Sequence, residues 1–364
     1  MALNVVGMGS AAPEFSIPQA EAAEVNKVFC GGPQKRLRAI PALYRRAGVR
    51  KRHSVVLQRA EGEPLARQSL YRPTRGAGDG GPTTGERMRA YEREAPPLLL
   101  RACGRAIDDA ALDPARITHL VTVSCTGFDA PGSDARIIAE LGLQRTVQRT
   151  HVGFMGCHGA LNGLRVAASF AGADPDAHVL VGAVELCTLH FYYGWDAEKI
   201  VANSLFADGA GALVGTGGNG HDRAGWRLQA NGTYLMPDSA DAMTWKIGDH
   251  GFHMTLSAQV PGLIREHLAA WMHSWLAGAG LTLDQIATWA VHPGGPRILD
   301  ATGEALGLPS GALAVSRDVL REFGNMSSAT LLFILERLRR EGASRPCVAV
   351  GFGPGMVVET ALWR

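Results

Sequence analysis

Short runs of consecutive apolar residues alternate with helix-like stretches along most of the chain. Runs with strand character cover 117–125, 178–186, 286–292 and 347–363, and each of the first three follows a helix-like stretch. Near-continuous apolar strands are typical of sheets that helices cover on both faces. A long helix is expected over 87–112, interrupted or restarted at its Pro-Pro pair, after a Gly-, Pro- and Thr-rich exposed loop. The pattern therefore predicts an α/β fold.

Two of these strand regions resemble each other. The segments 111–127 and 280–295 align so that Leu112 matches Leu281 and Ile117 matches Ile286. A glycine-rich turn also precedes a strand near the end of each part of the chain. This similarity indicates two halves built on one α/β plan, 1–220 and 221–364, joined within the glycine-rich stretch 215–227.

Composition narrows the classes of function. Hydrophobic residues make up 46% of the 364 residues and the net charge is only +2, so charge gives no general affinity for nucleic acid or membranes. One run, 35–52, carries eight Lys or Arg residues and no acid, which alone indicates a solvated face.

Six scattered cysteines without C-x-x-C spacing argue against disulfides and a metal site. Without a signal peptide or an apolar stretch of spanning length, we expect a cytoplasmic protein.

The first candidate for chemistry is Cys157, where a strand-like run gives way to an apolar helix in the sequence GFMGCHGALNGLRVA. Unpaired N–H groups and the helix dipole favour a thiolate at such a position and lower the pKa of the cysteine. The alternative is a small buried hydrophobic residue. His158 does not serve as a base on this evidence, because adjacent helical side chains diverge.

Two further candidates lie downstream. His292 ends a strand before Pro-Gly-Gly, at the carboxyl end where α/β sheets collect ligand-binding groups, although a lone histidine is more often a packed one. Asn325 follows Gly324 and precedes an amphipathic helix. It either caps that helix or offers its amide to a substrate carbonyl oxygen.

Eight short motifs along the chain occur in the same order as in a known enzyme family. They are VRKRH from Val49, FDAPGSD from Phe128, GCHGALNGLR from Gly156, SLFADGAGALVG from Ser204, VPGLI from Val260, HPGGPRILD from His292, GNMSSAT from Gly324 and GFGPG from Gly351. Over essentially the whole chain, the sequence resembles the type III polyketide synthases, the chalcone and stilbene synthase family with its bacterial members. This family is a branch of the thiolase-like condensing enzymes.

The resemblance implies a thiolase-like αβαβα layered sandwich of two similar halves and a homodimer. It implies an acyltransferase in which Cys157 takes a starter from an acyl-CoA, and His292 and Asn325 promote decarboxylative condensation with malonyl-CoA. Repeated condensation and cyclisation would give a pyrone, resorcinol or phloroglucinol. The substrates would be CoA thioesters, with no metal or cofactor.

The resemblance also assigns a substrate cavity. Phe206 matches the gatekeeper between the CoA tunnel and the cavity, and Met254 occupies the second gatekeeper position, with Phe252 close in register. Arg46, with its neighbours Arg50 and Arg52, falls in the CoA-tunnel region. The remaining cavity residues are Cys125, Cys187 and His190 in place of plant threonines, Trp245 in place of glycine, Ala130 in place of a methionine that reaches the partner, and Ser327.

Several alternatives stay open at this point. A ketoacyl synthase III makes a single condensation in fatty acid synthesis with the same three residue types, but it usually has Asn where this chain has Gly after His292. A hydroxymethylglutaryl-CoA synthase needs an additional acid near the nucleophile, and a non-catalytic acyl-binding protein would lack one of the three residues. The starter is also open. Trp245 and His190 favour a compact one, whereas Ala130 and Met254 favour a side tunnel for an aliphatic one, which is the slightly preferred expectation.

Overall fold

A nine-stranded mixed sheet forms the framework of the protein, in a computed structural model that describes residues 3–218 and 226–364. Strand β11 is parallel to β12, β4 is parallel to both β5 and β6, and the other neighbours are antiparallel. The strand order is β11 (Thr288–Val291), β12 (Cys347–Gly353), β13 (Val357–Trp363), β8 (Arg227–Leu235), β1 (Leu3–Ala11), β7 (Asp208–Thr216), β6 (His178–Leu186), β4 (His119–Ser124) and β5 (Gln148–Gly153).

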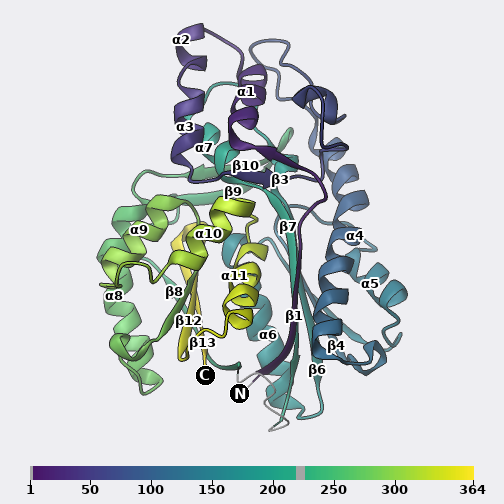
Figure 1. Cartoon of the computed structure of the whole chain (residues 1–364), viewed down its shortest axis with the longest axis vertical. Helices are drawn as coiled ribbons and strands as arrows, with labels where there is room; N and C mark the ends of the chain where they lie inside the picture. Colours follow the sequence, from purple (N-terminus) through teal and green to yellow (C-terminus); the bar gives the residue numbers. More distant parts are fainter. Residues whose placement is uncertain (1–2, 219–225) are drawn as a thin grey trace.

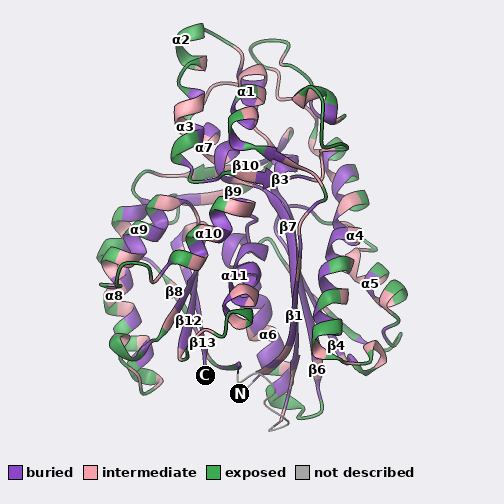
Figure 2. Ribbon diagram, in the orientation of Figure 1, coloured by how far each residue is buried: buried purple, intermediate pink, exposed green. Residues whose placement is uncertain are grey.

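Helices form three layers around this sheet, as Figure 1 shows. Two helices, α6 (Gly159–Ala173) and α11 (Ala329–Arg340), lie in the middle and are largely buried (Figure 2), because α6 consists mostly of small and apolar residues and the first seven residues of α11 are all apolar or Thr. The outer layers are amphipathic. They consist of α4 (Thr84–Ala110) and α5 (Ser133–Leu141) on one side, and α8 (Val260–Gly278), α9 (Pro296–Ala305) and α10 (Ala314–Phe323) on the other. This is the expected αβαβα arrangement.

The two similar segments adopt the same local structure. A long helix, α4 or α8, is followed by a single 3-10 turn, η2 (Pro114–Arg116) or η5 (Leu283–Gln285), and then by β4 or β11. Ile117 and Ile286 each follow the 3-10 turn directly. Most of the glycine-rich stretch expected to join the two halves, including the boundary at 220, lies outside the described residues.

Two local expectations were wrong in detail. Helix α4 continues through Pro96 and Pro97, because the residues around them pack against the sheet and this burial offsets the lost backbone hydrogen bonds. Its start is fixed by a capping box in which Thr83 and Glu86 bond reciprocally. The run 347–363 is not one strand but the hairpin of β12 and β13, which turns at η6 (Pro354–Met356).

A smaller group of elements lies over one end of the sheet, at the top of Figure 1. It brings segments from both parts of the chain together above the carboxyl ends of β4 and β6. Among the described helices, none is long and apolar enough to cross a membrane. The elements of this group are β2 (Ser16–Pro18), α1 (Gln19–Cys30), α2 (Gln34–Leu37), α3 (Ile40–Arg46), β3 (Lys51–His53), η1 (Pro64–Arg67), η4 (Cys187–His190), α7 (Ala197–Leu205), β9 (Met243–Gly248) and β10 (Gly251–Leu256).

Candidate active site

Cys157 lies in the one-turn 3-10 helix η3 (Gly156–His158), directly before α6. Gly156 has φ 76°, and a Cβ there would come within 2.4 Å of the Pro354 ring, so only glycine fits this turn. The Cys157 side chain is buried, and its Sγ is 3.6 Å from Oγ of Ser327. The α-helix therefore begins two residues after the cysteine rather than at it.

Asn325 is held by its backbone next to Phe206. Its N–H donates to the carbonyl oxygen of Leu205 at 2.9 Å, and its own carbonyl oxygen accepts from the N–H of Ala207 at 2.8 Å. The side-chain Oδ1 accepts from the backbone N–H of Ser327 at 2.8 Å, which turns Nδ2 the other way. Ser328, not Asn325, occupies the N-cap of α11. The capping interpretation of Asn325 is therefore wrong.

His292 follows β11, and its backbone N–H donates to the carbonyl oxygen of Val350 in β12 at 2.8 Å. Strand β12 also packs against η3, the turn that carries Cys157. The imidazole is almost completely buried, yet neither ring nitrogen has a hydrogen-bond partner in the described part of the chain. The buried Nδ2 of Asn325 is also unpartnered. Buried polar atoms nearly always have partners, so the imidazole of His292 and the Nδ2 of Asn325 are available to hydrogen-bond a ligand.

The electrostatics of this site differ from the expectation for a helix N-terminus. Burial raises the pKa of Cys157 to about 12, although the nearby Ser327 hydroxyl and Asn325 amide act in the opposite direction. Burial, with a smaller contribution from nearby His158, lowers the pKa of His292 to about 3. Desolvation therefore affects the pKa of Cys157 more strongly than the adjacent helix N-terminus does. Burial therefore favours the neutral form of both groups.

A cavity extends from Cys157 toward α7 and the β9–β10 hairpin. It encloses about 640 Å³ of atom-free space, a figure that includes its open mouth. The structure brings the residues assigned to the cavity wall together here, except Ala130, and Phe252 lies among them. Those residues are Cys125, Cys187, His190, Phe206, Trp245, Met254 and Ser327.

An aromatic group fills one side of this cavity. His190 donates from Nε2 to the carbonyl oxygen of Thr126 at 2.7 Å, and its Nδ1 accepts from the backbone N–H of Phe252 at 2.9 Å. Its ring stacks on that of Phe252 with centroids 4.3 Å apart, and Trp245 meets both rings edge-on. Burial lowers the pKa of His190 to about 3. His190 is therefore a neutral wall residue with a fixed tautomer.

Comparison with known proteins identifies the family. The N-terminal domain of the family described as chalcone and stilbene synthases matches residues 2–218, and the C-terminal domain of the same family matches residues 227–364. The chain belongs to the chalcone and stilbene synthase family.

Individual relatives and solved structures agree with this assignment. A 1,3,6,8-tetrahydroxynaphthalene synthase of Streptomyces peucetius subsp. caesius is 34% identical, over 99% of this chain and 93% of that protein. The alpha-pyrone synthesis polyketide synthase-like Pks18 of Mycobacterium tuberculosis is 32% identical, over 99% and 90%. The crystal structure of PKS-I from the brown alga Ectocarpus siliculosus superposes with a TM-score of 0.91 at 30% identity, over 100% of this chain and 99% of that one.

The chain is thus a type III polyketide synthase, an acyltransferase-type enzyme of the thiolase-like fold. Its relatives support iterative condensation of malonyl-CoA. The alternative of a ketoacyl synthase III in fatty acid synthesis is not favoured, because the family domains match both parts of the chain.

In this synthase, sequence reasoning missed a buried carboxylate beside the cavity. Glu185 accepts hydrogen bonds from the backbone N–H of Cys125 at 3.0 Å and from the hydroxyl of Thr126 at 2.7 Å, and burial raises its pKa. Sγ of Cys125 lies 3.2 Å from Oγ of Ser327, which in turn neighbours Cys157. A polar chain therefore connects Glu185 to the candidate nucleophile. An acidic residue inside the apolar run 178–186 was the signal that could have shown it.

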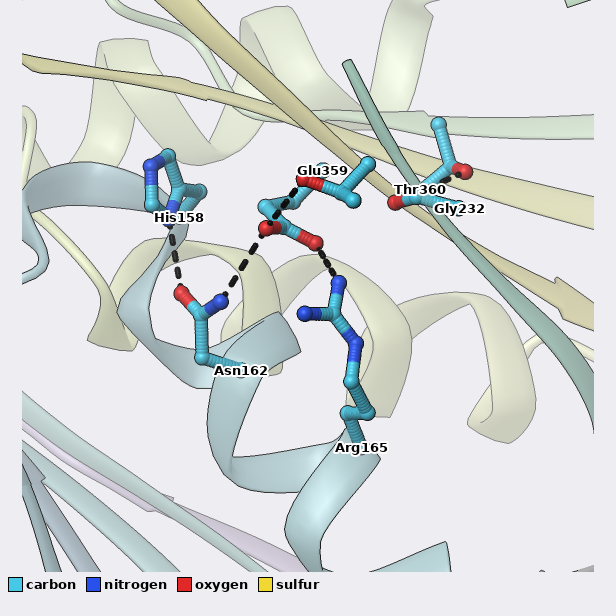
Figure 3. A network of polar contacts seen from close by, with 7 residues as sticks. His158, Asn162, Arg165, Gly232, Glu359 and Thr360 are labelled. Carbon is cyan, nitrogen blue, oxygen red and sulfur yellow. Dashed lines mark hydrogen bonds and ion pairs between the residues drawn. The ribbon is translucent and has the colours of Figure 1, made fainter. Parts of the chain in front are cut away.

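His158 of the synthase belongs to a separate network, drawn in Figure 3. Its Nδ1 bonds to Oδ1 of Asn162 at 2.7 Å, and Nδ2 of Asn162 donates to Glu359 at 3.1 Å. Arg165 forms an ion pair with the same carboxylate. A Cβ at Gly353 would come within 2.2 Å of the His158 ring, so this glycine makes room for it. The network ties the start of α6 to β13.

The basic run 35–52 contains both an exposed arginine, Arg46, and a buried one, Arg52. Arg46, at the end of α3, is exposed and has no hydrogen bond or ion pair with any described residue. Arg52 is buried and donates to Oε1 of Gln19 at 2.5 Å, to the carbonyl oxygens of Ser204 and Phe206 at 3.3 Å each, and to that of Asn203. The expectation that Arg52 faces the CoA tunnel is therefore wrong, because its buried guanidinium holds the chain around Phe206.

Ala130 does not line the catalytic cavity. It lies with Phe128 and Pro131 in a separate pocket beside β5. The smaller side chain at this position therefore opens no side tunnel from the cavity within one chain.

Proposed function

We propose that Cys157 is the nucleophile of this polyketide synthase and that His292 and Asn325 bind the thioester oxygen of malonyl-CoA. The observation that carries the proposal is the set of buried, unpartnered nitrogens on His292 and Asn325. Asn325 pairs with Phe206, which lines the cavity together with Cys157, and β12, which bonds the backbone of His292, packs against the turn of Cys157. Such donors, fixed before substrate arrives, stabilise charge that develops only during the reaction.

Loading of the starter begins with two neutral groups. His292 takes the proton of the Cys157 thiol as the sulfur attacks the thioester carbonyl of the starter acyl-CoA. The carbon–sulfur bond to CoA then breaks, and the CoA thiolate leaves with the proton. The starter is now an acyl-cysteine, and the imidazole is neutral again. The Ser327 hydroxyl and the Asn325 amide near the sulfur lower the pKa of the thiol, which favours this transfer.

Extension uses the same imidazole as a donor. The thioester oxygen of malonyl-CoA accepts hydrogen bonds from a ring N–H of His292 and from Nδ2 of Asn325. Loss of carbon dioxide leaves an enolate whose negative oxygen these donors stabilise. The enolate carbon attacks the acyl-cysteine carbonyl, and the Cys157 thiolate leaves. The lengthened chain is then carried on CoA and can reload Cys157 for another round before cyclisation.

We also propose sites for CoA and for a second subunit. Arg46 is exposed and has no partner among the described residues, so it is suited to bind a CoA phosphate.

Strand β5 is an edge strand of the sheet, and the large apolar residues Phe128, Phe154 and Met155 near it are exposed. An unpaired edge with apolar neighbours favours a homodimer through this face. Light scattering should give twice the chain mass, and Phe154→Glu should weaken the dimer.

The central test combines product analysis with detection of the acyl-enzyme. Purified protein is incubated with isotope-labelled malonyl-CoA and a series of acyl-CoAs, and products and intact protein are analysed by mass spectrometry. We expect extended, cyclised products and an acyl adduct on Cys157. A Cys30→Ala variant, which removes another buried cysteine outside the cavity, should behave like the wild type. Single-extension products only would contradict the proposal.

A further inference from the structure

Lys199 gives the catalytic cavity a single permanent charge. The described residues that line the cavity include no other Lys or Arg and no Asp or Glu. Near Cys157 the wall consists of thiols, hydroxyls and apolar side chains, so nothing there recognises a charged acyl group. Lys199 is therefore the feature of this wall that can select a substrate by its charge.

Helix α7 places this charge at a distance from the reacting sulfur. Lys199, Asn203 and Phe206 line the cavity at helical spacing, so they follow one face of α7 and its end. Phe206 is the bridge partner of Asn325, which marks the catalytic end. Seven residues at about 1.5 Å per residue put Lys199 about 10 Å further along the cavity. An acyl chain on Cys157 that follows α7 therefore points its distal end toward Lys199.

The lysine has no anionic partner. Its Nζ lies 3.9 Å from the centroid of the Tyr192 ring, and it forms no ion pair with a carboxylate in the described residues. The side chain is half-buried, and its neighbour His253 is kept neutral because burial and the positive charge of Lys199 lower its pKa. A partly desolvated cation held by an aromatic ring and lacking a counter-ion is suited to bind an anion from the cavity.

We propose that Lys199 binds the terminal carboxylate of the starter, so that the enzyme selects acyl-CoA starters whose chain ends in a carboxylate. The inference rests on the proposed function, because it requires the starter to be held on Cys157. The carboxylate of the malonyl extender is not the partner, since it must leave as carbon dioxide at the catalytic end. An ion pair with Lys199 would stabilise that carboxylate in the ground state and oppose its loss. This selection differs from the aliphatic starter preferred on sequence alone.

The test uses pairs of starters with equal carbon number. Succinyl-CoA is compared with butyryl-CoA, and glutaryl-CoA with valeryl-CoA, with malonyl-CoA as extender, in the wild type, Lys199→Met and Lys199→Arg. Kcat/KM for the wild type should favour the carboxylate member of each pair. Lys199→Met should reduce that preference by about fivefold or more, and Lys199→Arg should keep most of it. Lys27→Met, which removes a lysine paired with Glu24 on α1, is the control and should change nothing.

Three outcomes would overturn the inference. One is equal turnover of both members of each pair by the wild type, and another is an unchanged preference in Lys199→Met. The third is a rise in KM that is the same for every CoA substrate in Lys199→Met, which would show that Lys199 binds CoA phosphate instead. Absence of condensation with all starters would overturn the proposed function itself, whereas turnover of neutral starters alone overturns only the selection by Lys199.

Discussion

The indole Nε1–H of Trp245 donates to the backbone carbonyl oxygen of Cys125 at 2.7 Å. This bond joins the β9–β10 hairpin to the loop after β4 and fixes the indole in the wall of the cavity. Because the donor is satisfied and the ring meets His190 and Phe252 edge-on, the indole cannot swing aside without losing these contacts. The size of the cavity is therefore set by a wall that is itself well packed.

Replacing this indole should change the product. Trp245→Gly removes the largest side chain of the wall, so we expect longer polyketides and a wider range of starters. Product profiles measured by mass spectrometry across an acetyl- to palmitoyl-CoA series test this. Trp245→Phe, which keeps a ring but not the donor, should shift the profile much less. An unchanged profile in Trp245→Gly would show that the indole does not limit the cavity.

Removing the nucleophile should separate the two half-reactions. Cys157→Ala should abolish the acyl-enzyme and all polyketide product, while weak decarboxylation of malonyl-CoA continues because the donors on His292 and Asn325 remain. Intact-protein mass spectrometry and release of labelled carbon dioxide measure the two steps. Circular dichroism confirms that the variant is folded. Product formation at the wild-type rate would refute the assignment of the nucleophile.

The two donors should differ in their effects. Loss of one oxyanion donor typically costs about a hundredfold to a thousandfold in rate. His292→Ala should slow both loading and decarboxylation, since the imidazole is base and donor, whereas Asn325→Ala should slow decarboxylation more than loading. Rapid-quench measurement of acyl-enzyme formation, alongside carbon dioxide release, distinguishes the steps. Equal loss of loading in both variants would contradict this division.

Alkylation should depend strongly on pH. The pKa of Cys157 is raised to about 12 by burial, so the reactive thiolate is a small fraction at neutral pH and grows with every pH unit up to that value. Inactivation by iodoacetamide should therefore accelerate steadily from about pH 7 to about pH 10. A rate that is already constant across this range would instead show a preformed ion pair with His292.

Arg46 and Arg52 should give opposite phenotypes. Arg46→Ala should raise KM for CoA substrates with little change in stability, and the effect should shrink as salt screens the exposed charge. Arg52→Ala leaves several buried carbonyl oxygens without a donor and should lower the free energy of unfolding by about 2–4 kcal/mol. Steady-state kinetics at two salt concentrations and urea unfolding measure the two effects. An unchanged KM for Arg46→Ala at low salt would mean that this arginine belongs to a solvated face.

Apolar periodicity predicted much of the fold, whereas the residues of the cavity wall were predicted only from the family resemblance. The run 178–186 is β6 from end to end, and the repeated α/β segments were visible because burial imposes the same pattern on both. The state of Cys157 could not be predicted, because its pKa depends on desolvation by segments hundreds of residues away. Arg52 and Lys199 are similar cases. In the sequence each is an ordinary basic residue. Only the fold shows that Arg52 is buried and bonds backbone carbonyl oxygens, whereas Lys199 lines a cavity.

The backbone bonds between Asn325 and the residues around Phe206 have a mechanical consequence. Leu205 and Ala207 are each bonded to Asn325, and Arg52 donates to the carbonyl oxygen of Phe206, so the backbone at Phe206 and the backbone of Asn325 are held together. A displacement of this segment would carry the amide of Asn325 with it and spoil the site. For the proposed gate at Phe206, passage would therefore depend on rotation of the ring about its side-chain torsions, and this rotation would leave the position of the Asn325 amide unchanged.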